Sequence, residues 1–295
     1  MAKVSTNKPL QGAVGDIVFY HRNGKLYAKQ KECRFSKKSQ SEEQMIRRMR
    51  WPNLVNLWKA FPQGLRPYFE NRADGVTNYN QFLSTNMLNG QERIYLTKSH
   101  TRDFGCVLTS VTLAAGSLPP IATEWDNVGL LTNIALGSLT IASDTTVGSL
   151  SAAIIRNNFF YADGDRIRFY SATQQVDETG RPYVSILCQE MVLDLFDWRP
   201  LSLVVQASSG FASRNGRLAA SDNPCGGRAW VHLRPSSDNR LLCSTQQLVC
   251  NNESIRNLFN TEEALLAAID SYGGFTSRPT LQPAPTEAEQ SRFRQ

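Results

Sequence analysis

The sequence predicts an α+β fold that is mostly β, in which a small N-terminal region of a hairpin and helices precedes an antiparallel β-sandwich or barrel-like body. Three observations support this expectation. The chain has 295 residues, 41% of them hydrophobic and 20% charged, which is typical of a folded globular protein. Apolar residues recur at helical spacing within residues 39–88. From residue 92 onward, short β-branched or alternating segments recur between Gly, Pro, Asn and Asp residues, as in antiparallel sheets.

The first predicted element is a hairpin, GDIVFYHRNGKLYAKQ, whose two strands flank Asn23-Gly24. That dipeptide tolerates the positive φ angles of a type I′ turn, which matches the twist of paired strands. Ile17 and Phe19 share one face of the first strand, and Val18 and Tyr20 share the other. We expect both faces to be largely apolar, so the ribbon must pack against something else.

Two helices should follow the hairpin. Ser39 and Ser41 each precede a Glu or Gln by three residues, which is the pattern of a capping box. Pro52 should kink or split the first helix. A second helix is expected over residues 76–88, ending at Gly90. The apolar stripe of the first helix comprises Met45, Met49, Leu54, Val55 and Trp58, and that of the second comprises Tyr79, Phe82, Leu83 and Met87.

The body should contain eight strand-like segments, a helical insertion over 145–158 and a last helix with Thr261 as its N-cap. The strand-like segments are 93–100, 106–113, 129–142, 165–176, 181–196, 201–211, 227–235 and 240–251. We therefore divide the chain into a basic N-terminal arm, hairpin and helices (1–91), a β-rich body (92–275) and a mobile polar tail (276–295).

Positive charge is concentrated at the start of the chain. Residues 1–50 contain twelve Lys or Arg and four acidic residues, a net charge of +8, whereas the whole chain carries +6. Such a region attracts phosphate groups or an acidic protein surface by long-range steering, without specifying which.

The sequence contains no catalytic motif, so we expect no enzymatic activity, no catalytic residue, no cofactor and no metal site. His21, His100 and His232 fall in three separate predicted elements, and Asp163 and Asp165 are interpreted as turn residues before a strand. An active site assembled from distant residues stays open. The six cysteines lack metal-ligand spacing and are interpreted as reduced thiols in a cytosolic protein.

Several stretches resemble an uncharacterised group of Bacteroidetes proteins whose N-terminal pattern reads G-x-x-G-x-x-V-x-Y-x-R-N-G-K-x-Y-x-R. The stretches are GAVGDIVFYHRNGKLYAKQK, SEEQMIRRMRW and TNYNQFLSTN, with further similarity at RLLCSTQQLV and AAIDSYGG. Lys29 stands where the pattern more often has Arg. The group has no established activity, so the resemblance supports the domain division and supplies no site residues.

Two functional hypotheses follow. The first is a non-enzymatic structural or assembly protein of a large multi-subunit particle, of phage virion, tail or appendage type, that assembles in the cytoplasm as a homo-oligomer or with other structural subunits. Its subunit-contact candidates are Ile17, Val18, Phe19, Tyr20, Leu26 and Tyr27. The alternative is a nucleic-acid-associated protein that uses its basic N-terminal region, with no membrane span in either case. Its phosphate or acidic-partner candidates are Lys25, Lys29, Lys31, Arg34, Lys37 and Lys38.

Overall fold

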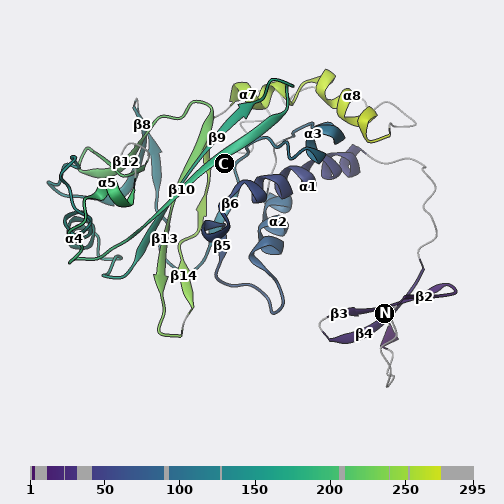
Figure 1. Cartoon of the computed structure of the whole chain (residues 1–295), viewed down its shortest axis with the longest axis horizontal. Coiled ribbons are helices and arrows are strands. Elements are labelled where there is room, and N and C mark those ends of the chain that lie inside the picture. Colours follow the sequence, from purple (N-terminus) through teal and green to yellow (C-terminus); the bar gives the residue numbers. More distant parts are fainter. Residues whose placement is uncertain are drawn as a thin grey trace, which may run out of the picture. The chain divides into compact units, whose positions relative to one another are not determined.

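The computed structural model describes residues 2–3, 12–22, 24–31, 42–89, 93–126, 128–205, 210–238, 240–251 and 253–273. These residues form two compact units, an N-terminal sheet within residues 1–41 and a body that begins at Glu42 (Figure 1). The fold is α+β and mostly β, as the sequence predicts. The predicted tail, 276–295, lies outside the described residues.

The N-terminal sheet is a four-stranded antiparallel sheet in the order β1-β4-β3-β2. Its strands are β1 (Ala2–Lys3), β2 (Gly12–Val14), β3 (Ile17–Arg22) and β4 (Lys25–Gln30). Two-residue turns separate β2 from β3 and β3 from β4, and Gly15 (φ 59°) and Gly24 (φ 70°) adopt the left-handed backbone that these turns need. The predicted hairpin is therefore confirmed as β3 and β4, with Asn23 outside the described residues.

The body is built on a five-stranded antiparallel sheet in the order β10-β9-β13-β14, with β16 also paired to β13. Its strands are β9 (Arg166–Val176), β10 (Pro182–Val192), β13 (Gly226–Pro235), β14 (Leu241–Cys243) and β16 (Val249–Asn251). Strand β9 pairs with β10 along all eleven residues of each strand. This sheet separates two hydrophobic cores, because alternate side chains of β9 and β13 enter opposite cores.

One core lies between this sheet and a second sheet in the order β11-β12-β8-β7, so the two sheets form a sandwich. Phe169 and Trp230 face Leu130, Ile134 and Leu218 there. The second sheet comprises β7 (Thr123–Trp125), β8 (Gly129–Ala135), β11 (Ala212–Arg214) and β12 (Arg217–Ser221). Helix α4 (Val147–Asn157) contributes to the same core and begins with a capping box at Thr146.

The opposite face of the central sheet is covered by α1 (Glu42–Ala60) and α2 (Asn78–Asn89) (Figure 1). Trp58 and Phe61 pack with Phe82 of α2 and with Tyr170 of β9. A small sheet in the order β15-β6-β5 joins this layer; its strands are β5 (Tyr68–Phe69), β6 (Thr112–Ala115) and β15 (Gln246–Gln247). Since both helices share a core with the central sheet, the compact units divide between residues 41 and 42 rather than at residue 91.

Three local predictions are wrong in whole or in part. Helix α1 continues through Pro52, so the alternative that the proline splits the helix is wrong; the buried residues Met49, Leu54 and Leu57 anchor both halves to the core. The alternative that Pro52 kinks the helix stays a prediction. Residues 93–97 form no strand and lead into α3 (Lys98–Arg102), which Thr97 caps. The segment 201–211, predicted as a strand, instead starts as helix α5 (Leu201–Val204), which is followed by a bend at residue 205.

The remaining elements are short helices. The predicted last helix is confirmed as α8 (Glu262–Ser271), whose N-cap is Thr261. Two further short helices, η1 (Gln63–Leu65) and α7 (Glu253–Leu258), were not predicted from the sequence.

Buried amide side chains hold the extended segment 106–112 between the helices and the central sheet. Asn53 of α1 donates to the Val107 carbonyl (3.0 Å) and accepts from its N–H (2.7 Å). Asn86 of α2 makes the same pair of bonds with Thr112, at 3.1 and 2.7 Å. Gln174 of β9 accepts from the N–H of Leu108 at 2.6 Å. The side chains thereby supply hydrogen bonds that a neighbouring strand would otherwise make.

Replacing Asn53 with Ala should destabilise the body, because the buried N–H and carbonyl of Val107 lose their partners. We expect the free energy of unfolding to fall by about 2–4 kcal/mol in urea titrations. Asn80→Ala, at an exposed position on α2, is the matched control and should change it by less than about 0.5 kcal/mol. Equal effects of the two changes would contradict this role for Asn53.

Candidate functional site

The cross-strand register of the N-terminal sheet determines which side chains share a face. Residues directly opposite each other in an antiparallel pair point to the same side. Phe19 of β3 lies opposite Ala28, and Tyr20 lies opposite Tyr27. The sheet therefore has two chemically different faces.

The first, which we call the apolar face, comprises Val14, Ile17, Phe19, Leu26 and Ala28, together with the exposed polar side chains of His21 and Gln30. Val14 is 66% exposed and Ile17 is 46% exposed, while the other three apolar side chains are half-buried. No side chain described in this sheet is fully buried. The apolar side chains of this face are therefore more exposed than those in the cores of the body.

The second, which we call the basic face, comprises Tyr20, Arg22, Lys25, Tyr27 and Lys29, with Val18 among them. The rings of Tyr20 and Tyr27 stack, with centroids 5.7 Å apart and planes at 23°. Arg22 lies directly opposite Lys25, and Val18 lies opposite Lys29. The expectation of two largely apolar faces is therefore wrong, because β4 places lysines beside the apolar and aromatic residues of β3.

The register also sorts the predicted site residues. Of the six subunit-contact candidates, Ile17, Phe19 and Leu26 lie on the apolar face, and the other three, Val18, Tyr20 and Tyr27, lie on the basic face. Lys25 and Lys29 share the basic face, whereas Lys31 follows the end of β4, where its N–H donates to the Asp16 carbonyl. The remaining phosphate candidates, Arg34, Lys37 and Lys38, lie outside the described residues.

Sequence reasoning missed Arg22 as a member of the basic face. The signal was present, because a two-residue turn at Asn23-Gly24 makes Arg22 and Lys25 cross-strand partners.

Sequence spacing did not reveal a buried cluster of ionisable groups around Asp165 in the body. His232 Nε2 lies 2.8 Å from Asp165 Oδ2, and Arg234 donates to both oxygens of Asp165 at 2.7 Å. The ring of Tyr161 packs against His232 at a tilt, with centroids 4.4 Å apart and planes at 33°. Asp165 and His232 are 67 residues apart in sequence, and the pairing of β9 with β13 brings them together.

The Asp165 cluster has the geometry of a structural network. The carboxylate also accepts the N–H of Ala162, so Arg234, His232 and the backbone together use its acceptor sites. Burial alone would raise the pKa of Asp165, but the hydrogen bonds from Arg234, His232 and Ala162 outweigh it and lower the pKa to about 2. A cavity of about 140 Å³ adjoins His232 and is lined mainly by asparagine and aromatic side chains. The cluster holds the turn before β9 against β13.

Replacing Asp165 with Asn should lower the free energy of unfolding at neutral pH by about 3 kcal/mol, because Arg234 and His232 lose their anionic partner. The carboxylate stabilises the fold fully above its unfolded pKa of about 3.9, and this stabilisation is lost as the pH falls through about 2. The difference between wild type and Asp165→Asn should therefore narrow from pH 4 to pH 2 in unfolding titrations. A difference independent of pH would contradict the network, and Asp238→Asn, at an exposed turn, serves as the control.

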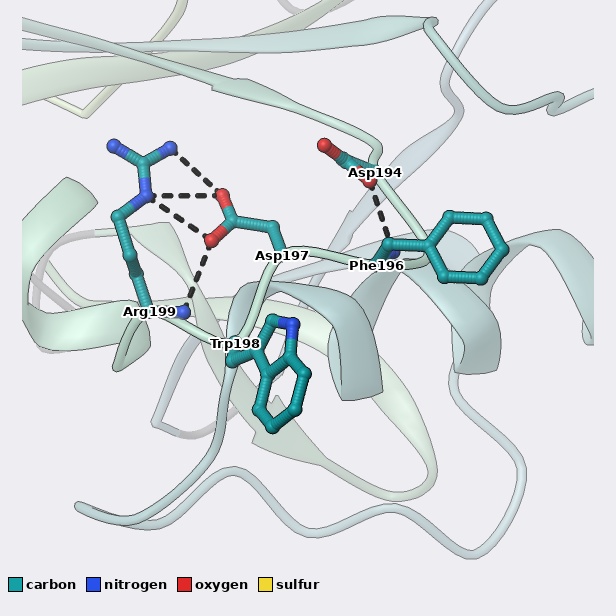
Figure 2. Close-up of a pocket in the computed structure, with 5 residues that line it drawn as sticks. All are labelled: Asp194, Phe196, Asp197, Trp198 and Arg199. Atoms are coloured by element: carbon teal, nitrogen blue, oxygen red, sulfur yellow. Dashed lines mark hydrogen bonds and ion pairs between the residues drawn. The ribbon is translucent and has the colours of Figure 1, made fainter.

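A second exposed surface lies on the loop that follows β10. Phe196 is 80% exposed and Trp198 is 87% exposed. Figure 2 shows both rings pointing away from the ion pair of Asp197 with Arg199, whose closest atoms are 2.7 Å apart. Asp194 accepts the N–H of Phe196 at 2.8 Å. These bonds fix the loop conformation while two large aromatic rings stay in solvent.

The loop is also tied to helix α4. The N–H of Gly148 donates to the carbonyl of Asp197 at 2.7 Å. A Cβ atom at Gly148 would lie only 2.9 Å from that oxygen, so a glycine is required for this approach.

Comparisons of the chain with protein-family models, with curated proteins and with solved structures gave no match. The resemblance to the Bacteroidetes group stays a prediction. Within the described residues, no helix has both the length and the apolar character needed to cross a membrane. Those residues also contain no group of three or more His, Cys, Asp or Glu side chains arranged to hold a metal ion.

Proposed function

We propose that the protein is a non-enzymatic structural subunit of a large multi-subunit particle, of phage virion, tail or appendage type, and that the apolar face of its N-terminal sheet contacts a second copy of the chain. The observation that carries this proposal is the incomplete burial of that face. Val14, Ile17, Phe19 and Leu26 are partly or largely exposed, whereas each core of the body buries its large apolar side chains almost completely.

The energetics favour covering the apolar face. Burial of apolar surface contributes about 25 cal/mol per Å², so sheltering these four side chains contributes several kcal/mol before the cost of association. A small sheet with one uncovered apolar face is also marginal on its own. A second copy offers the same apolar face, and an isologous contact would pair the two.

The strand edges provide a second means of contact. Strands β1 and β2 form the two edges of the N-terminal sheet, and edge strands have backbone groups available for pairing with another chain.

The loop that follows β10 offers a second exposed surface, so each subunit can make more than one contact. Phe196 and Trp198 belong to the body, whereas the apolar face belongs to the other compact unit. Two separate contact surfaces allow a subunit to bind more than one neighbour, as an extended particle requires. We place assembly in the cytoplasm, in keeping with the free thiols of the five cysteines described.

The assembly proposal is tested by the mass of the purified chain in solution. The full chain should form oligomers in light scattering, and deletion of residues 1–31 should give the 33.0 kDa monomer less the deleted segment. Ile17→Thr combined with Phe19→Thr should also dissociate the oligomer, because threonine retains strand propensity but removes apolar area.

Val18→Thr is the matched control, since Val18 lies on the basic face and the oligomer should persist. A monomeric full chain, whose stability is the same with and without residues 1–31, would count against the proposal.

A further inference from the structure

We infer that the basic face of the N-terminal sheet is a binding surface for single-stranded nucleic acid. This inference goes beyond the assembly proposal, because it uses the side of the sheet opposite the apolar face. The two faces alternate residue by residue along β3 and β4, so one small sheet carries two independent surfaces.

The arrangement of charge is the first support. Arg22 and Lys25 are both exposed and face each other directly across the strands. Like charges in this position destabilise a sheet, and a bound anion would relieve the repulsion. Neither side chain forms an ion pair with an acidic residue in the part of the chain that the structure describes. Asp16, in the turn before β3, is the one acidic residue described in this unit.

The tyrosines are the second support. Tyr20 and Tyr27 form a stacked pair between the cations at the turn and Lys29. Along β4 the order is Lys25, Tyr27, Lys29, with successive members about 6.8 Å apart. Surfaces that bind single strands combine cations along the phosphate backbone with aromatic rings on which bases stack. The basic face has both elements in alternation.

The lysines and the tyrosine pair together favour single-stranded nucleic acid over other anionic partners. A membrane surface would favour apolar and basic side chains on one side, yet Ile17, Phe19 and Leu26 lie on the side away from the lysines. An acidic protein would give the tyrosine pair no specific role. A duplex keeps its bases stacked inside, so it offers phosphates to the lysines but no free base to the rings.

Sequence outside the described residues adds to the charge. Arg34, Lys37 and Lys38 follow the sheet closely along the chain, within the segment 1–50 that carries +8. Their charge adds to that of the segment and strengthens long-range attraction of a polyanion.

The test uses the full chain and a fluorescent oligothymidylate of about 20 nucleotides, longer than the sites typical of such surfaces. Arg22→Gln, Lys25→Gln and Lys29→Gln combined should weaken binding at low salt about tenfold or more, and should reduce the slope of log K against log salt by about 2. The charge-matched control combines Arg47→Gln, Arg102→Gln and Arg240→Gln, at exposed positions in the body, and should bind more tightly than the face variant.

The tyrosines are tested separately. Tyr27→Leu should weaken oligothymidylate binding about fivefold or more and leave heparin binding unchanged, while Tyr27→Phe, which keeps the ring, should restore the affinity. Absence of binding at low salt would overturn the inference. The inference would also be overturned if the two charge variants lost the same amount of affinity for oligothymidylate. It would be overturned as well if Tyr27→Leu weakened the binding of heparin as much as that of oligothymidylate.

These measurements are independent of the assembly proposal. The charge variant should keep the mass of the wild type in light scattering, and Ile17→Thr with Phe19→Thr should retain binding by the monomer. A monomeric wild type that still binds oligothymidylate through the basic face would refute the assembly proposal alone.

Discussion

Successive side chains of a β-strand point to opposite sides, so every strand needs an environment for each of its two faces. Strand β9 of the body meets this constraint: Tyr170 and Phe169 are neighbours on it, yet each is fully enclosed in a different core. The N-terminal sheet obeys the same geometry without such cover, and none of its described side chains is buried. This contrast matters for function, because a face that the described residues leave partly exposed is available to another molecule.

Taken together, the two proposals would make the N-terminal sheet a link between a particle and its contents. Apolar side chains on one face favour a like surface of another subunit, and the cations and stacked tyrosines on the other favour a phosphate backbone with accessible bases. The short distance between the faces means that one sheet can serve both contacts. Buried amides and the Asp165 network hold the body together.

Much of the fold could be predicted from the sequence where local chemistry determines it. Asn23-Gly24 identified the hairpin, Thr261 identified the last helix, and alternation identified β9 and β10. The apolar pattern of residues 93–97 predicts a strand, but Ile94 and Leu96 are buried against Phe259 from a loop, and burial in a loop gives the same pattern. The pairing of Asp165 with His232 could not be predicted from their separation in the sequence, because it depends on strand β9 lying next to β13 in the sheet. The residues of the basic face could be predicted from the sequence, because the two-residue turn at Asn23-Gly24 determines the register of the two strands.

The central claim, that another subunit covers the apolar face, is tested most directly by photo-crosslinking from that face. A photoreactive benzoylphenylalanine in place of Phe19 would be irradiated in a mixture of chains with normal and heavy isotopes, and the linked peptides identified by mass spectrometry. The account predicts linked pairs that combine one normal and one heavy peptide. Links found only between peptides of the same isotope, all within single chains, would contradict it.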